Sequence, residues 1–211
     1  MKLIFIDKDM KITSYIHSCF LIETNKVRIV TDPYNPYIGF TLPENLTADI
    51  VTVSHHHKDH AEISAIKGSP KIVEKPGMFE FDRCAITGIK SFHDNESGKL
   101  RGENTIFVIE TGNKKICHLG DLGHLLDQNT LSEIGEIDVL FVPVGGTFTI
   151  GPEEAVEITE AINPKLVIPM HYHVDKLTLS TQILTADNFL NQIKNSNINT
   201  KALSWGESID I

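Results

Sequence analysis

A dense group of histidine and aspartate residues lies in the first third of the chain, where residues 54–60 read SHHHKDH. The group directly follows the apolar stretch 50–53, which predicts a buried strand. Residues two apart in a strand point the same way, so His55 and His57 can converge on one ion. Asp59 and His60 come where the chain turns, and they are free to face a second ion. Imidazole and carboxylate are ligands that suit zinc, iron and related divalent ions.

A histidine-rich surface tract is the competing interpretation of this motif. Four such residues within six positions seldom serve packing, because buried His and Asp must be paired or bound to a metal to offset their desolvation. The apolar strand before the motif and the short helix expected after it favour a metal site.

Two ions need more ligands than this motif supplies. The remaining candidates are histidines that follow or end expected strands: His93, His118, His124, His171 and His173. The carboxyl ends of strands are where open α/β sheets place their ligands. Spacing alone therefore indicates a site with more than one metal, and it does not assign a role to each residue.

The motif resembles the signature His-x-His-x-Asp-His of the metallo-β-lactamase superfamily, and the resemblance runs over essentially the whole chain. The stretches HLGDLGH, VPVGGTFTI and VIPMHYH resemble the branch that includes ascorbate-6-phosphate lactonase-like hydrolases. The resemblance implies an α+β fold, the αββα four-layer sandwich, in which two mixed β-sheets are flanked by helices. It also implies two ligand sets: His55, His57 and His93 for one metal, Asp59, His60 and His171 for the other, and Asp121 bridging both.

Such a pair of ions can share a hydroxide, lower its pKa towards neutrality and neutralise charge that develops during reaction. We expect two divalent ions, zinc first, although manganese, iron and nickel tolerate the same ligands. The sequence has no Gly-x-Ser-x-Gly elbow and no obvious Cys-His pair, which suits a reaction without a nucleophilic side chain.

We therefore expect a binuclear metal-dependent hydrolase that uses a metal-bridging hydroxide on a small anionic substrate, such as a phosphodiester, lactone or amide. The residues expected to take part in catalysis are Asp59 and His173. His173 would be a general acid or a substrate contact, although its place near a strand end also explains it.

Several residues near the motif leave two interpretations open. Asp32 either accepts a hydrogen bond from a ligand histidine or is a simple turn residue. His118 and His124, on either side of Asp121, are proton-donor candidates or ordinary packing residues. Arg101 could bind a carboxylate or phosphate through two hydrogen bonds, but a structural ion pair is the more common fate of a lone arginine.

Two rival functions use the same ligands. One is a di-iron redox protein, but relatives of that kind join the centre to a flavin domain, and none follows residue 211. The other is a non-catalytic, metal-binding sensor. The intact ligand set counts against a degenerate site.

The elements that must position these residues are mostly short strands rich in β-branched residues. We expect strands over residues 2–7, 11–17, 20–23, 26–31, 50–54, 71–74, 85–92, 105–110, 115–119, 139–144, 166–170 and 202–209. Helices are expected over residues 60–67, 152–162 and 186–193, the second opened by Pro152 and two acids. Strands followed by helices in two successive halves favour two packed sheets with helices outside, in a single domain over residues 1–211.

The composition of the chain limits the classes of partner that we expect it to bind. A formal charge of −9 argues against nucleic acid, which is bound through Lys and Arg. No stretch approaches the roughly 20 apolar residues that span a membrane. Three cysteines without a close-spaced pair indicate reduced thiols in a cytoplasmic protein. We expect a small-molecule substrate and no membrane, and base rates allow a homo-oligomer.

Overall fold

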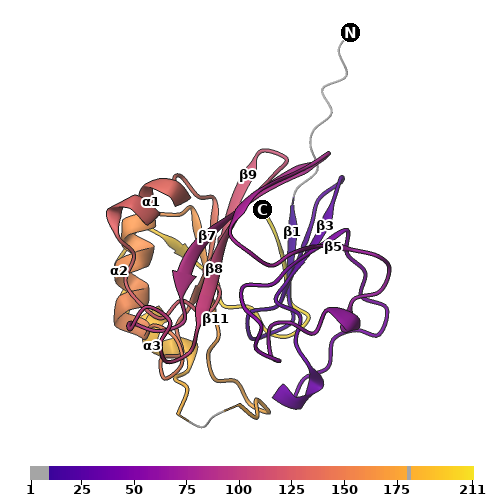
Figure 1. Ribbon diagram of the computed structural model, residues 1–211. Helices are drawn as coiled ribbons and strands as arrows, with labels where there is room; N and C mark the ends of the chain where they lie inside the picture. The colour runs from indigo at the N-terminus through magenta and orange to yellow at the C-terminus, as the bar shows by residue number, and fades with distance from the viewer. Residues whose placement is uncertain (1–9, 180–181) are drawn as a thin grey trace.

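Two mixed β-sheets face each other in the computed structural model, which describes residues 10–179 and 182–211 (Figure 1). The six-stranded sheet has the order β13 (Ser208–Asp210), β1 (Lys11–Ser14), β2 (Phe20–Glu23), β3 (Arg28–Thr31), β4 (Ile50–Thr52) and β5 (Lys71–Val73). The seven-stranded sheet has the order β12 (Asn199–Thr200), β11 (Leu166–Met170), β10 (Val139–Pro143), β9 (Lys114–His118), β8 (Glu103–Thr111), β7 (Cys84–Phe92) and β6 (Gly77–Phe81).

Alternation along the strands divides the apolar residues between two cores. On β2, Phe20 and Ile22 belong to the main core, which both sheets share, whereas Leu21 belongs to a smaller core on the opposite face. On β4, Ile50 and Val51 are divided in the same way. The smaller core is covered by the loop over residues 32–48, which includes the 3-10 helix η1 (Pro36–Ile38).

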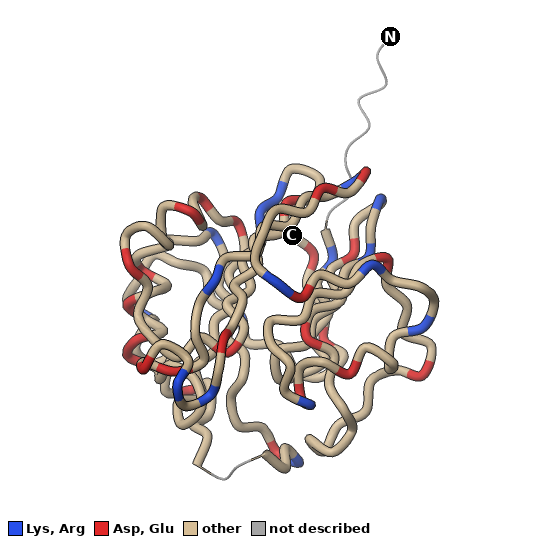
Figure 2. Tube along the Cα trace, in the orientation of Figure 1, with Lys and Arg blue, Asp and Glu red and all other residues tan. Residues whose placement is uncertain are grey.

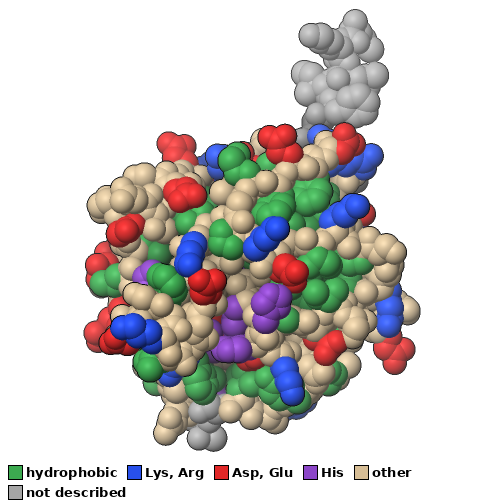
Figure 3. All heavy atoms as spheres, viewed as in Figure 1, with side chains coloured by type: hydrophobic (Ala, Val, Ile, Leu, Met, Phe, Trp, Pro, Cys, Tyr) green, Lys and Arg blue, Asp and Glu red, His purple; other side chains and the backbone are tan. Residues whose placement is uncertain are grey.

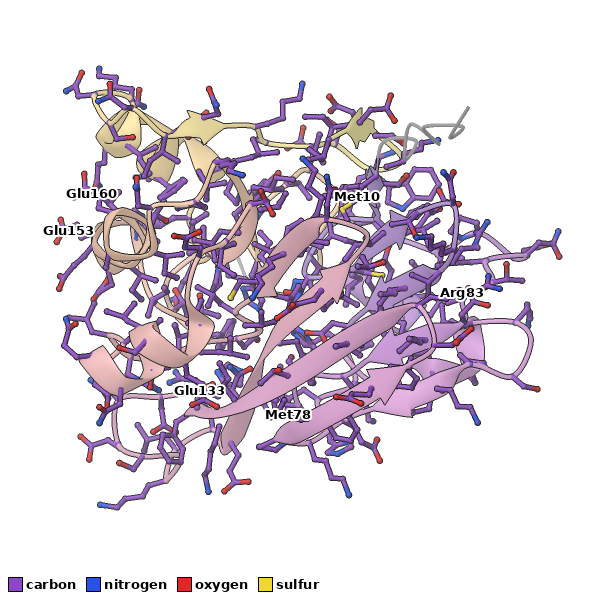
Figure 4. All side chains as sticks on the ribbon, turned by 90° about the horizontal axis from the view of Figure 1, so that it is seen from above. Met10, Met78, Arg83, Glu133, Glu153 and Glu160 are labelled. Atoms are coloured by element: carbon purple, nitrogen blue, oxygen red, sulfur yellow. The ribbon has the colours of Figure 1, made fainter. Side chains whose placement is uncertain are left out.

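Three α-helices lie on the outer side of the seven-stranded sheet: α1 (Gln128–Ile134), α2 (Pro152–Ile162) and α3 (Ala186–Ile193). On α2, Ala155 and Ile158 are buried in the main core. Glu153 and Glu160 of the same helix point outward in Figure 4. Acidic positions, red in the Cα trace of Figure 2, predominate along the helical side at the left of that view. Among the residues that the structure describes, no helix has the length and apolar character needed to cross a membrane.

The expected fold class is confirmed, with two mixed sheets and few helices. The expected strand over residues 2–7 lies outside the described residues. The helix expected over residues 60–67 is only a 3-10 turn, η2 (Ile63–Ala65). Its continuation is prevented because the Lys67 N–H donates to the Leu46 carbonyl, which fixes this segment against the loop of the smaller core.

Further differences lie at exposed or irregular segments. β6, β12 and α1 were not expected. Of the strand expected over residues 202–209, only the last two residues form strand, because the chain turns at Gly206 (φ +76°) and β13 begins at Ser208, where it pairs with β1. The strand expected over residues 11–17 ends at Ser14, because Ile16 and His17 both have a positive φ (70° and 58°).

Candidate metal centre

The candidate ligands come from loops that leave the strands at one edge of both sheets. The motif 54–60 follows β4, His93 follows β7, Asp121 lies shortly after β9, and His171 follows β11. Histidine side chains gather on the face shown in Figure 3, between the two halves of the molecule. Sequence segments far apart are therefore brought to one place by the ends of their strands, as expected from strand polarity.

The structure brings together all seven residues that the resemblance implies as ligands. Their centre is Asp121, whose Oδ2 lies 3.1 Å from Nε2 of His93, 3.1 Å from Nε2 of His171 and 3.2 Å from Nε2 of His60. The Nε2 atom of His55 lies 3.8 Å from the same oxygen.

The donors around Asp121 form two groups. One group holds His55, His57 and His93, with Nε2 of His55 only 3.1 Å from Nδ1 of His57. The other holds Asp59, His60 and His171 together with a residue that was not expected, His17.

This donor set fits divalent metal ions. Three imidazole nitrogens surround one buried carboxylate oxygen, and other ring nitrogens face each other at hydrogen-bond distance. A neutral imidazole carries only one N–H, so protons alone satisfy such a crowded set poorly. Three buried atoms have no hydrogen-bond partner among the described protein atoms: Nδ1 of His93, Nδ1 of His171 and Oδ1 of Asp121. Nitrogen and carboxylate donors converging in this way suit zinc and its neighbours.

The charges within the site favour cation binding. Burial and the neighbouring His60 lower the pKa of His55 to about 2, so its ring is neutral at physiological pH and has a free lone pair. Burial alone would raise the pKa of Asp121, but His171 and His60 hold it well below the usual range. Burial would likewise lower the pKa of His60, yet Asp121 and Asp32 raise it well above 6.5. A divalent cation bound here would take the place of that proton.

Asp32 orients two of the histidine rings. Its Oδ2 accepts a hydrogen bond from Nδ1 of His60 at 2.9 Å, and its Oδ1 accepts the Ser54 N–H at 2.8 Å. The Ser54 hydroxyl donates to Asp32 at 2.5 Å, which leaves its oxygen to accept from Nδ1 of His55 at 3.0 Å. Both rings therefore present Nε2 to the centre, as ligand histidines with an outer hydrogen bond do. The hydrogen-bonding interpretation of Asp32 is the one that the structure supports.

Two glycines allow the loops to approach each other. Gly120 has a φ of +57°, and a Cβ there would lie 2.3 Å from Oδ1 of Asn104. A Cβ on Gly145 would lie 2.2 Å from the carbonyl oxygen of His171. Larger residues at either position would displace the loop that carries Asp121 or His171.

His17 is the residue at the centre that sequence reasoning missed. It lies in the turn between β1 and β2, and its fully buried side chain places Nε2 3.2 Å from Oδ2 of Asp59 and 3.0 Å from Nε2 of His60. The sequence placed it at the end of a strand, and its only signal was that a histidine stood next to a turn.

An open cavity of about 310 Å³ adjoins the centre. Its lining residues are His57, Asp59, His93, Arg101, Asp121, Phe148, His171 and Leu179. A second cavity of about 450 Å³ shares His93, Arg101 and Phe148 with the first. Arg101 and Phe148 therefore stand between the metal centre and a second compartment.

Asp94 positions the loop that carries Arg101. Its carboxylate accepts backbone N–H groups of Glu96, Gly98, Leu100 and Arg101 at 2.7–2.9 Å. Burial alone would raise the pKa of Asp94, but these donors lower it to about 2. Arg101 itself donates to the Thr147 carbonyl at 3.0 Å, and its guanidinium lies 5.8 Å from the centre of the Phe148 ring.

The other histidine candidates lie outside the cluster. His118 bonds to the carbonyl of Ser18 and to the N–H of Gly120, which agrees with the packing interpretation. His124 lines the second cavity, and both its ring nitrogens bond to backbone groups. His173 is half-buried, its backbone N–H donates to Leu184, and it is not among the residues that line the 310 Å³ cavity. Its catalytic role stays a prediction.

Comparison with known proteins gives one consistent family. Residues 11–171 match the family described as "Beta-lactamase superfamily domain". A UPF0173 metal-dependent hydrolase of Carboxydothermus hydrogenoformans is 30% identical over 193 residues, covering 78% of this chain and 85% of the relative. Another, from Pelotomaculum thermopropionicum, is 34% identical with 78% and 85% covered.

Solved structures agree with these relatives. A metallo-β-lactamase superfamily protein of Thermotoga maritima is 39% identical with a TM-score of 0.77, covering 92% of this chain and 98% of that one. The di-iron β-hydroxylase CmlA of Streptomyces venezuelae has a TM-score of 0.69 at 14% identity, covering 97% of this chain and 54% of that one. At this identity the likeness to CmlA shows the fold alone.

Proposed function

The chain belongs to the metallo-β-lactamase superfamily and is a metal-dependent hydrolase, and on that premise we propose that it binds two divalent ions and hydrolyses a small anionic substrate. The observation that carries the proposal is the position of Asp121. A single carboxylate oxygen lies within 3.2 Å of nitrogens from both donor groups, as expected of a residue shared by two ions.

The seven residues of the resemblance would hold the ions in the two sets that it implies, with zinc as the first choice of metal. Bound ions of this kind supply Lewis acidity, which lowers the pKa of water and stabilises developing negative charge. Asp32 and Ser54 keep the histidine rings in the tautomer that this requires.

Asp59 is the carboxylate best placed to handle a proton during the reaction. It lines the cavity, and 17% of its side chain is exposed. Burial would raise its pKa, but the hydrogen bond from His17 and the charge of His60 hold it below the usual range. Asp59 is therefore ionised at neutral pH and can accept a hydrogen bond from water in the cavity.

The volume and charge of the cavity support a small anionic substrate. Arg101 uses one N–H on the Thr147 carbonyl, and a guanidinium has five such donors. The remaining donors can bind a carboxylate or phosphate at the border of the two cavities. The apolar ring of Phe148 beside them can contact the body of the substrate.

The first experiment is elemental analysis of protein purified without chelator, followed by assays of the metal-replete form on phosphodiester, lactone and thioester substrates. We expect about two metal equivalents, lost together with activity in Asp121→Ala. Iron-loaded protein that undergoes redox change without hydrolysis would support the di-iron alternative. A folded chain that takes up no metal would overturn the proposal.

We also propose that the protein is cytoplasmic, and its three cysteines support this location. Cys19, Cys84 and Cys117 are buried and unpaired. Because unpaired thiols persist in reducing surroundings, we place the protein in the cytoplasm.

A further inference from the structure

The fully buried side chain of His17 places Nε2 within 3.2 Å of two members of the second donor group, Asp59 and His60. We propose that His17 is itself a metal ligand, and that it completes the second metal position together with Asp59, His60 and His171. The inference rests on the proposed function, because it presumes that the centre binds metal.

The distances match those of donors that share an ion. The donor atoms of His17, Asp59, His60 and His171 all lie within 4.8 Å of one another. The Nε2 atoms of His17 and His60 are 3.0 Å apart. Two nitrogens on one zinc ion, each 2.0–2.1 Å from it, are separated by about 2.9–3.4 Å at ligand angles of about 90–110°.

The simpler alternative is that His17 only orients Asp59 through a hydrogen bond. A histidine that only orients Asp59 needs one N–H directed at that carboxylate and no contact with a second ligand nitrogen. Nε2 of His17 instead faces a second ligand nitrogen as well as the carboxylate, and its Nδ1 is buried with no partner among the described protein atoms. His93 and His171, two of the implied ligands, have the same unpartnered Nδ1, and so does His173, which lies outside the cluster.

The backbone fixes His17 in this position. Ile16 and His17 have φ angles of 70° and 58°, a conformation that costs free energy in residues other than glycine. The carbonyl of His17 accepts the N–H of His171 at 3.1 Å. The ring centres of these two residues are 4.3 Å apart, so the turn carries the ring directly against another ligand.

A ligand at His17 makes the two metal positions unequal. The side chains of His17 and His60 are fully buried, and neither lines the cavity. His57 and His93, in the other group, both line it, and His57 is exposed. Both positions reach the cavity, since Asp59 and His171 of the second group line it as well. The second position differs in having four donors against three, two of them fully buried. We therefore infer that the second position binds its ion more tightly.

The direct test is NMR of the unmodified chain, labelled with ¹⁵N-histidine and loaded with two equivalents of ¹¹³Cd. A ring nitrogen bonded to cadmium shows scalar coupling to it, and a nitrogen that is only nearby does not. We expect coupling from six rings: His17, His55, His57, His60, His93 and His171. Because this readout uses the unmodified protein, it does not depend on a variant that folds.

Variants then locate the effect. In His17→Asn, we expect one coupling to disappear and the affinity of one zinc equivalent to fall about 100-fold, the upper end for residues that support a metal site. His56→Asn is the matched control. His56 lies within the motif 54–60, but its side chain is exposed and belongs to neither donor group, so all six couplings should persist.

The outcomes separate the two proposals. Two bound cadmium ions without coupling to His17, and His17→Asn affinities within about threefold of the unmodified chain, would overturn the role of His17 and leave the binuclear proposal intact. A single bound ion coupled to His17 would support His17 as a ligand and overturn the binuclear centre. A folded chain that binds no cadmium would overturn both.

Discussion

Asp32→Asn should weaken metal binding without unfolding the protein. The Asp32 carboxylate is fully buried and accepts three hydrogen bonds, from Ser54 N–H, the Ser54 hydroxyl and Nδ1 of His60. Asparagine has nearly the same shape and tolerates the left-handed φ of +38° at this position. The substitution therefore changes hydrogen bonding and charge, and leaves packing almost unchanged.

The expected loss of metal affinity in Asp32→Asn follows from the hydrogen bonds that Asp32 accepts. If the asparagine oxygen keeps the Ser54 N–H, its NH₂ group faces Nδ1 of His60. Two donors then oppose each other, unless the His60 proton moves to Nε2, the nitrogen that faces the metal centre. Either result reduces the fraction of His60 that can bind an ion. Changes to such outer partners cost 10- to 100-fold in metal affinity, which is about 1.4–2.7 kcal/mol.

The assay is a zinc titration against a competing chelator, with the melting temperature of the metal-free form as the folding check. Asp49→Asn is the matched control, because its exposed carboxylate also accepts a backbone N–H, that of Arg28, at 2.8 Å. If Asp32→Asn bound both ions within about twofold of the unmodified chain, the argument that Asp32 fixes the His60 tautomer would be refuted.

Four further predictions follow from the site. Arg101→Ala should raise KM for an anionic substrate by about 10- to 100-fold, the loss of one charge-assisted hydrogen bond, while a neutral analogue is unaffected and Arg101→Lys recovers part of the loss. Chelation should lower the melting temperature by about 5–10 °C, since ligand at 100 times Kd adds about 2.7 kcal/mol; an unchanged melting curve would contradict a bound ion. If His173 is the general acid, His173→Ala should lower kcat about 100-fold, and an unaltered kcat assigns that role elsewhere. Burial raises the pKa of the Cys84 thiol to about 11, so only about 0.1% of it is thiolate at pH 8, and burial also raises the pKa of the Cys19 and Cys117 thiols; iodoacetamide should modify none of the three before denaturant is added, as mass spectrometry can check.

Much of the fold could be predicted because its strands are buried and its turns are marked. Strands β2 and β11 and helices α2 and α3 have the bounds expected from the sequence. β6 was missed because it is a largely exposed edge strand: Met78 is 79% exposed, so the apolar alternation that identifies a strand is absent there. The helix expected at residues 60–67 failed for a different reason, since the long-range bond from Lys67 to Leu46 outweighed local propensity.

For the site, the motif at residues 54–60 could be found from spacing, because strand periodicity places its ligands without knowledge of the fold. Grouping the distant His93, Asp121 and His171 required the family resemblance. His17 could not be found in either way. It contacts His60, which is 43 residues away in the sequence, and it does so through a turn with positive φ angles that the residue types in the turn do not predict.

Part of the strained backbone lies at the candidate ligands. Among the described residues, eight non-glycine residues have a positive φ: Ile16, His17, Asp32 and His171 lie at or directly beside the centre, and Ser97, Thr147, Asn163 and Lys176 lie elsewhere. Such conformations cost roughly 1–3 kcal/mol each, and they persist only when the surrounding structure fixes them. Here two hydrogen bonds help to fix these conformations: the Ser54 N–H donates to the Asp32 carboxylate, and the His171 N–H donates to the His17 carbonyl. Bound metal would supply more, by joining the side chains of these turns through a common ion. Local sequence therefore does not predict the position of His17, because long-range contacts at the centre determine the conformation of its turn. We expect metal binding to be thermodynamically linked to the local folding of this edge.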